Sequence, residues 1–268
     1  MHNSGGVTRD QQRSWRRDGF LLVRGALDPT EVTQLLARID DIVERYAASE
    51  HGFRQSTGAY KVAEAITLTD ALDPLLDHQR TFPVLLDLLG PFLQVLGTEI
   101  FVRPSRESQD LLVAWHTDGG PTLGRFLPRP GDPTLQLKTQ FFLTDLPETD
   151  SGNFMLVPGS HRRLFPKEGL NETPREAMQL TVRAGDAVLF PWSLWHAVAP
   201  NHSGRARRSV TVRYGQLWSR PYDYERLPPW VLARMTARRR RLLGDLGSVH
   251  PSSYFHADEE EQLRLMRG

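Results

Sequence analysis

Apolar residues follow a helical spacing in the first third of the chain. Between Val32 and Tyr46 they recur three, four and seven positions apart, which is typical of a helix with one buried face. The preceding Asp28-Pro29-Thr30-Glu31 supplies a capping side chain, a proline suited to the first helical position and an acid in the first turn. We therefore predict a helix here. Two further elements are predicted around it, a short buried strand over Gly19–Val23 and a second helix over Pro83–Leu89.

From Leu93 onward the pattern changes to short apolar runs separated by clusters of Gly, Pro, Asp and Ser. One such cluster, Ala184-Gly185-Asp186, predicts a tight hairpin turn, and Pro128–Pro133 predicts a surface loop. The candidate strands are Leu93–Val102, Leu111–Trp115, Leu135–Leu143, Asn153–Val157, Gln179–Val182, Ala187–Phe190, His196–Val198 and Ser209–Trp218. About eight short strands in roughly 125 residues predict a jelly roll, in which two sheets enclose a cavity. The expected fold class is mainly β with flanking helices, packed outside one sheet.

The 268-residue chain has an ordinary globular composition, with 39% hydrophobic and 24% charged residues. No repeat or low-complexity linker divides it, so we expect one domain over residues 1–268, with its β core at about 93–218. Cysteine is absent, which excludes disulfides, thiolate metal sites and cysteine nucleophiles and favours a cytoplasmic protein. The chain shows neither a targeting signal nor an apolar run of membrane-spanning length, so we expect no membrane partner.

Charge balance argues against a nucleic-acid partner, because 33 Lys and Arg residues face 32 Asp and Glu residues, a net charge of +1. One local exception is Arg238–Arg241, in a tail predicted to be helical after Pro228. The run allows a nucleic-acid interpretation, but we favour a solvated helix end with arginines near the C-terminal dipole. The acidic run Asp258–Glu261 either pairs with these arginines or is solvated.

The segment Trp115-His116-Thr117-Asp118-Gly119-Gly120 carries the most chemistry. Residues two apart in an extended strand project from the same face, so His116 and Asp118 point together. A second histidine, His196, lies 80 residues later at another β segment. Two histidines and one carboxylate form the facial triad of non-haem Fe(II) oxygenases. A lone His-x-Asp also occurs by chance in surface turns, so the prediction depends on what accompanies His196.

The spacing of an arginine after His196 supports the metal-site interpretation. Arg207 lies eleven residues later, beyond a turn centred on Asn201–Gly204, and would sit on the adjacent strand. A planar guanidinium in that place is suited to hold a carboxylate in a bidentate pair.

Together these features resemble the phytanoyl-CoA dioxygenase family of Fe(II)- and 2-oxoglutarate-dependent oxygenases. The matching residues run in the family's order over about residues 18–218. They are His116-Thr117-Asp118, Gly152, Val157-Pro158-Gly159-Ser160-His161, Ala184-Gly185-Asp186, Phe190, His196, Asn201 and Arg207.

The resemblance implies a double-stranded β-helix that binds Fe(II) through His116, Asp118 and His196 and uses O2. It implies that 2-oxoglutarate chelates the iron and places its far carboxylate against Arg207. Arg208 competes for that role, but strand alternation puts Arg207 on a small polar face with Ser209 and Thr211, so we favour Arg207. The weaker candidates for the 2-oxoglutarate site are Lys61, Thr117, Gln140 and Ser209. Lys61 is as well explained as an exposed lysine.

The expected reaction is oxidation of a C–H bond in a small molecule. Hydroxylation is the default outcome, while epimerisation or ring closure would suit a bacterial secondary metabolite and antibiotic biosynthesis. Asp118 makes chlorination unexpected, because the family's halogenases carry a small residue there. Trp115, Trp192 and Trp218 are candidates for substrate contact, although most of the tryptophans near the site are expected in the core. We expect no metal-ligating role for His161 or His202.

Three other interpretations stay open at this point. The first is a non-catalytic jelly-roll protein that binds a metal or ligand, which would not need a buried arginine after His196. The second is a cupin-type metalloenzyme without 2-oxoglutarate, but such enzymes bring additional histidines close in sequence, and none lies near His116. The third, a nucleic-acid or protein demethylase, lacks a basic stripe. The sequence indicates neither the substrate nor the oligomeric state.

Overall fold

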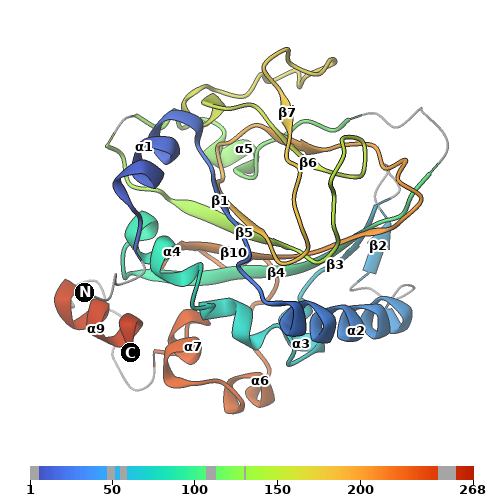
Figure 1. The fold of residues 1–268 in the computed structure, drawn as a ribbon. Helices are drawn as coiled ribbons and strands as arrows, with labels where there is room; N and C mark the ends of the chain where they lie inside the picture. The colour runs from blue at the N-terminus through green and yellow to red at the C-terminus, as the bar shows by residue number, and fades with distance from the viewer. Residues whose placement is uncertain (1–5, 47–51, 55–58, 107–112, 130, 247–257) are drawn as a thin grey trace.

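The computed structural model describes residues 6–46, 52–54, 59–106, 113–129, 131–246 and 258–268, and it contains two facing antiparallel sheets (Figure 1). The larger sheet has the strand order β1-β8-β5-β10-β4-β3-β2. Its strands are β1 (Leu21–Val23), β8 (Ala187–Pro191), β5 (Gln136–Phe142), β10 (Arg207–Gln216), β4 (Leu93–Arg103), β3 (Tyr60–Val62) and β2 (Gly52–Arg54). The smaller sheet has the order β7-β6-β9, with β7 (Met178–Gln179), β6 (Phe154–Leu156) and β9 (His196–Val198). This is the predicted double-stranded β-helix.

Helices cover the outer face of the larger sheet (Figure 1). The α-helices are α1 (Arg9–Asp18), α2 (Pro29–Tyr46), α3 (Ala65–Leu68), α4 (Phe82–Leu89), α5 (Gly120–Leu123), α6 (Pro229–Ala233), α7 (Ala237–Leu242) and α9 (Glu259–Arg267). Two 3₁₀ turns, Asp73–Asp77 and Ser160–Arg162, complete the set of described helical segments. Leu35 and Ile39 of α2 pack with Phe141 and Val212 of the sheet in one apolar cluster. None of the described helices is both long and apolar enough to cross a membrane.

The helix predicted from the apolar stripe is confirmed as α2, and the helix over Pro83–Leu89 is confirmed as α4. Asp28 Oδ1 accepts from the backbone N–H groups of Thr30 and Glu31, as its capping role requires. The predicted turn at Gly185 is confirmed too. Gly185 has a φ of +94°, and a Cβ there would lie 2.5 Å from the Leu27 carbonyl oxygen.

One predicted strand is wrong, and another is shifted. Leu111 and Leu112 lie outside the described residues, but Val113–Trp115 is irregular, because the Trp115 N–H donates to the Val113 carbonyl and closes a local turn. Pairing begins only at His116, in an isolated bridge with His196. In place of Gln179–Val182, β7 ends at Gln179, and Val182 forms a separate bridge with Leu146.

The arginine run differs from the predicted solvated helix end. Arg238 and Arg239 both reach Asp77, at 3.5 and 2.6 Å. Arg241 is buried, and its Nη1 donates to the Leu93 carbonyl at 3.3 Å. Burial lowers the pKa of Arg241 to about 10. The run therefore fastens α7 to the body of the protein, because the 3₁₀ turn at Asp73–Asp77 presents acids to it.

Candidate metal centre and its cavity

The inner face of the larger sheet is polar, although most of it is buried. Alternate residues of β4, β5 and β10 point away from the helices, and their register places them side by side. The polar ones are Glu99 and Arg103 of β4, Gln136, Lys138 and Gln140 of β5, and Arg207, Ser209, Thr211 and Arg213 of β10, and the same face also carries Phe101 of β4 and Phe142 of β5. All of the polar ones but Arg213 are buried. The face of the larger sheet that lies toward the smaller sheet is therefore rich in charged and hydrogen-bonding side chains.

His116, Asp118 and His196 meet beside this face. The N–H of each histidine donates to the carbonyl of the other at 3.0 Å, so the two rings lie with their centroids 4.2 Å apart. Asp118 follows two residues after His116, and its N–H donates to the Trp192 carbonyl at 2.9 Å. One potential ligand atom from each of the three residues lies within 4.8 Å of the other two.

Both imidazoles are held in the tautomer that suits a metal ligand. Nδ1 of His116 lies 2.9 Å from the Ala114 carbonyl, and Nδ1 of His196 lies 2.9 Å from the Leu194 carbonyl. A carbonyl oxygen only accepts, so Nδ1 donates in both rings and Nε2 keeps its lone pair. Burial, together with the neighbouring His116, lowers the pKa of His196 to about 3. Its ring is therefore neutral at physiological pH.

Only one of the two carboxylate oxygens of Asp118 accepts a hydrogen bond from a described residue. Oδ1 accepts from Lys138 Nζ at 2.7 Å and lies 3.4 Å from Arg213 Nη2. Oδ2 is buried without a hydrogen-bond partner and lies 3.6 Å from His196 Nε2. Burial alone would raise the pKa of Asp118, but the charge of Lys138 and its cationic neighbours lowers it far below the ordinary value. Two imidazole nitrogens and one ionised oxygen form a donor set that fits Fe(II).

Arg207 projects from the same inner face, and no acid among the described residues forms an ion pair with it. It is 3% exposed, and its Nε and Nη2 atoms are buried without a partner. Arg103 lies opposite it in the register and also has a buried, unpartnered Nε. Burial, with the charge of Arg103, lowers the pKa of Arg207 to about 9. Arg208 points outward and pairs with Asp40 of α2 at 2.6 Å. The pair Arg207 and Arg103 therefore presents unmatched positive charge to an anion.

The weaker candidates for the 2-oxoglutarate site lie in different surroundings. Gln140 Nε2 donates to Ser209 Oγ at 3.0 Å on the inner face. Lys61 forms an ion pair with Glu99 of β4, and its Nζ lies 5.7 Å from the centre of the Phe101 ring. Thr117 is half-buried, and its side chain makes no hydrogen bond to any described residue.

The three candidate tryptophans are widely different in exposure. Trp115 packs in an apolar cluster with Trp195. Trp192 is buried against Gly119, where an added Cβ would lie 2.4 Å from the indole. Trp218, which follows β10, is 61% exposed.

The two other histidines lie in loops. His202 Nδ1 donates to the Arg106 carbonyl at 2.8 Å. His161 is buried beside Gly19, and burial lowers its pKa to about 4. Among the described residues, neither joins the His116, Asp118 and His196 cluster.

Four charged residues of the inner face were not predicted from the sequence to belong to the site. They are Lys138, Arg213, Glu99 and Arg103. The available signal was strand alternation, which we applied to Arg207, Ser209 and Thr211 but did not extend to Arg213. The same alternation along β5 leads from Gln140 back to Lys138.

Comparisons with known proteins agree with this geometry. Residues 15–209 match the family described as Phytanoyl-CoA dioxygenase (PhyH). Ectoine dioxygenase of Bordetella bronchiseptica is 27% identical over 244 residues, covering 79% of this chain and 76% of that protein. The dioxygenase cdmA of Talaromyces verruculosus is 24% identical, covering 85% of this chain and 80% of that protein.

Solved structures of similar fold include two with metal or cosubstrate bound. HygX of Streptomyces hygroscopicus, with nickel and 2-oxoglutarate, superposes with a TM-score of 0.66 at 17% identity, covering 81% of this chain and 90% of HygX. The epimerase SnoN from nogalamycin biosynthesis, with Fe3+ and alpha ketoglutarate, has a TM-score of 0.60 at 25% identity, covering 76% and 81%. This chain belongs to the phytanoyl-CoA dioxygenase family of enzymes that use iron and 2-oxoglutarate.

Proposed function

We propose that this enzyme binds Fe(II) through His116, Asp118 and His196, and that it oxidises a C–H bond of a small molecule. The observation that carries the proposal is Asp118 Oδ2, a buried and ionised oxygen with no partner, 3.6 Å from the lone pair of His196 Nε2. Lys138 and Arg213 engage only Oδ1, so Oδ2 is a buried carboxylate oxygen that accepts no hydrogen bond from a described residue. Leaving such an atom unsatisfied is costly, so a cation between Oδ2 and Nε2 is the expected occupant of this place.

Iron and 2-oxoglutarate together supply the oxidising power, since O2 and 2-oxoglutarate are converted to succinate and CO2 while one oxygen atom becomes available to the substrate. The chain's own residues position and shield these groups. Backbone carbonyls fix the two histidine rings, and Lys138 holds Asp118 Oδ1, which leaves Oδ2 as the oxygen that would bind the metal. We assign the far carboxylate of 2-oxoglutarate to Arg207, with Arg103 beside it. A dianion there would offset their two unmatched charges.

Hydroxylation is the simplest outcome, and epimerisation or ring closure are alternatives. SnoN, named an epimerase, and SnoK, named a carbocyclase, have the same fold at 25% and 24% identity. HygX has been solved with hygromycin B bound. These neighbours support a secondary metabolite as the substrate, and a role in antibiotic biosynthesis.

An anaerobic titration of the purified protein with Fe(II) and 2-oxoglutarate tests the proposal. The chelate of the two gives a weak visible charge-transfer band. We expect the band in the wild type, no band in His116→Ala, and a weakened band in Arg207→Ala. Arg208→Ala is the matched control and keeps the band, because Arg208 points toward α2. Iron binding without any band in the folded wild type would overturn the proposal and favour a binding protein.

A further inference from the structure

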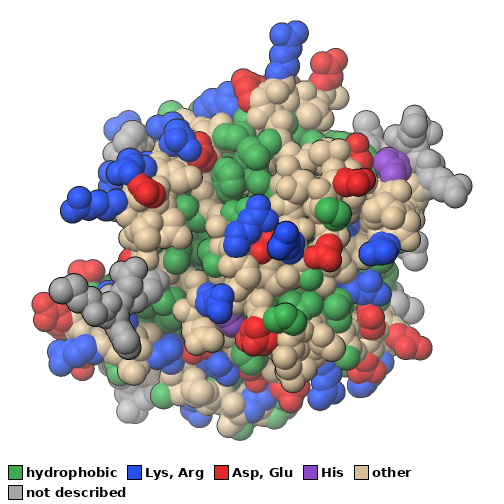
Figure 2. Space-filling model, viewed as in Figure 1, with side chains coloured by type: hydrophobic (Ala, Val, Ile, Leu, Met, Phe, Trp, Pro, Cys, Tyr) green, Lys and Arg blue, Asp and Glu red, His purple; other side chains and the backbone are tan. Residues whose placement is uncertain are grey.

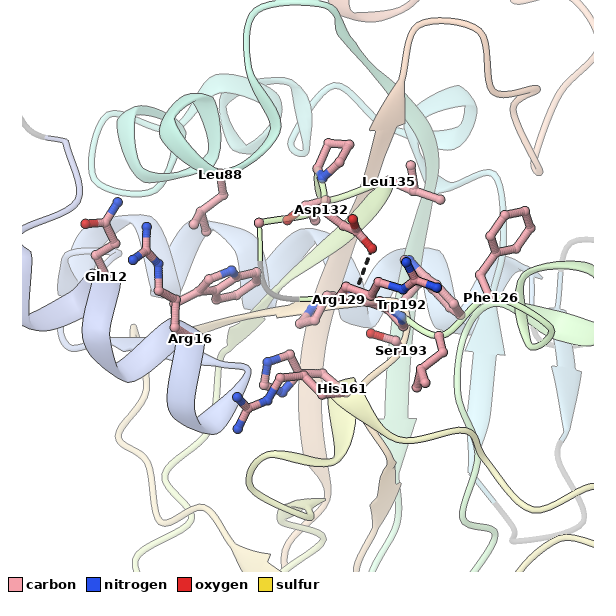
Figure 3. Close-up of a pocket in the computed structure, with 18 of the residues that line it drawn as sticks. Gln12, Arg16, Leu88, Phe126, Arg129, Asp132, Leu135, His161, Trp192 and Ser193 are labelled. Carbon is pink, nitrogen blue, oxygen red and sulfur yellow. Dashed lines mark hydrogen bonds between the residues drawn. The ribbon is translucent and has the colours of Figure 1, made fainter.

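A pocket of this protein lies outside the metal centre, between α1, α4, residues 126–129 and 131–135, and the turn after β8 (Figure 3). Its volume is about 760 Å³. That size falls in the range of roughly 300 to 1,000 Å³ typical of small-molecule sites. None of the three candidate metal ligands lines it.

Trp192 connects this pocket to the metal centre. Trp192 is one of the lining residues, and its carbonyl accepts the Asp118 N–H at 2.9 Å. The indole also lies against Gly119, the residue after Asp118, so closely that any side chain there would collide with it. A ligand in the pocket therefore rests on a residue that contacts the backbone of a candidate metal ligand. That is a suitable place for the part of a substrate remote from the reacting carbon.

The pocket has an incompletely covered apolar surface. Trp15 of α1 and Trp192 line it, and Phe126 and Leu127 on its rim are 57% and 48% exposed. Exposed large apolar side chains beside a pocket mark a ligand surface, because water contact is unfavourable for them. Aromatic faces of this kind favour a planar ring system by stacking.

The same pocket carries unmatched positive charge. Arg16, Arg129 and Arg162 line it, and no described carboxylate lies within ion-pair distance of their guanidinium groups. The two acids of the pocket are engaged by backbone amides: Asp132 accepts the Arg129 N–H, and Asp87 accepts the Val7 N–H, each at 2.7 Å. Figure 2 shows basic side chains gathered over α1, the helix that bears Arg16. Three arginines and two acids leave a net charge of +1, which favours an anion.

We propose that this pocket binds the substrate and selects a planar, apolar ring system that bears a carboxylate or phosphate group. The ring stacks between the tryptophans and Phe126, and the anion pairs with the arginines at the rim. That this ligand is the substrate rests on the proposed oxygenase function, whereas its chemical class rests on the pocket alone.

Dye binding tests the ligand class without iron or turnover. The probe is 1-anilinonaphthalene-8-sulfonate, an aromatic anion, and N-phenyl-1-naphthylamine is its uncharged match. We expect Arg16→Gln, Arg129→Gln and Arg162→Gln each to weaken the anionic dye by about threefold to fivefold, with little change for the neutral dye. Arg175→Gln is the control, because Arg175 is exposed and does not line the pocket. Equal binding of the two dyes, or an equal loss in Arg175→Gln, would overturn the proposal.

Turnover then separates the pocket from the oxygenase function. With Fe(II) and 2-oxoglutarate present, succinate formation is measured with aromatic carboxylates, aryl phosphates and their uncharged amides or alcohols. Stimulation by one anionic series, lost in Arg129→Gln, supports the proposal and identifies carboxylate or phosphate. Stimulation by uncharged compounds alone overturns the proposed ligand class but leaves the oxygenase standing. Charge-dependent dye binding without iron-dependent succinate formation under any condition supports the anion pocket and overturns the oxygenase.

Discussion

The two faces of strands β4, β5 and β10 are built from alternate residues of the same backbone, yet they differ in nearly every property. The outer face carries Phe141, Val212 and Tyr214, which pack against the helices in the main apolar cluster. The hydroxyl of Tyr214 on this face is satisfied, since its Oη donates to the carbonyls of Leu75 and Leu76. The inner face carries Lys138 and Arg207, which are buried among other charges. Alternate residues of the same strands thus serve two purposes: one set packs in the core, and the other set supplies the charged groups of the candidate site.

The difference is clearest in the unsatisfied buried atoms. Glu99 Oε2, Arg103 Nε and two nitrogens of Arg207 lie on the inner face without partners, and Asp118 Oδ2 lies beside it. The outer face has Thr139 Oγ1 as an exception. Unsatisfied buried groups cost stability, so their concentration on one face indicates that ligands complete that face.

Phe141→Ala should have the largest effect and should act on the outer face alone. Phe141 is fully buried, so its truncation should lower the free energy of unfolding by about 3–5 kcal/mol. Urea denaturation measures this loss. The folded fraction should keep the Fe(II) and 2-oxoglutarate affinities of the wild type, and a specific loss of either affinity would break the separation of the two faces.

Lys138→Met should show how much stability is lost when the buried carboxylate of Asp118 loses its nearest positive charge. It removes the donor closest to Asp118 Oδ1 and leaves Arg213 at 3.4 Å, so the metal-free protein should lose about 3 kcal/mol. A divalent cation replaces the missing positive charge, so Mn(II) should raise Tm more in this variant than in the wild type. Differential scanning calorimetry with and without Mn(II) checks both effects, with the exposed Lys167→Met as control. An equal Mn(II) shift in both proteins would contradict the role given to Lys138.

Arg207→Met and Arg208→Met compare adjacent residues on opposite faces. Loss of Arg207 should weaken 2-oxoglutarate binding by about 100-fold, because a desolvated, charge-assisted pair is removed. It should leave the ligand-free protein as stable or more stable, since an unmatched buried cation disappears. Arg208→Met should lower stability by less than about 1 kcal/mol and leave 2-oxoglutarate binding unchanged. Isothermal titration with Mn(II) present distinguishes them, and the reverse result would show that the strand register is shifted by one residue.

Asp223 gives the smallest predicted effect, and one that depends on pH. Its carboxylate lies against Gly97 of β4 and accepts the Thr98 N–H, and burial raises its pKa to about 6. The folded state therefore holds this proton more tightly than the unfolded state, so this residue's contribution to stability is lost as pH rises from about 4 to 6. Asp223→Asn should become more stable than the wild type over that interval, by about 2 kcal/mol, and hold the difference above it. Urea denaturation at pH 4, 5, 6 and 8 measures it. A difference that does not change with pH would mean that Asp223 is charged in both states.

Sequence patterns predicted the elements in which periodicity and burial agree. The stripe of α2 and the His-x-Asp spacing both depend on local geometry alone, and the pleat separated Arg207 from Arg208. Gln140 was predicted as a site residue, but Lys138 on the same face of β5 was not, because a lysine in an alternating strand resembles the solvated side of a sheet. The fold buries that side, and Lys138 is only 8% exposed. The irregular Val113–Trp115 was missed because its apolar residues resemble a strand, whereas the bond from the Trp115 N–H to the Val113 carbonyl closes a local turn.

Helix α1 is a segment that could be exchanged for the corresponding segment of a relative. It is closed at its start by a reciprocal cap between Thr8 and Gln11 and at its end by Gly19, and none of its residues is fully buried. It nevertheless supplies Trp15 and Arg16 to the pocket. Recombining this one segment with those of relatives would therefore change the proposed substrate pocket without altering the candidate metal ligands or the strands of the larger sheet, and of the residues of α1 only Trp15 packs against the main apolar cluster. For directed evolution of new selectivity, α1 is the segment to vary first.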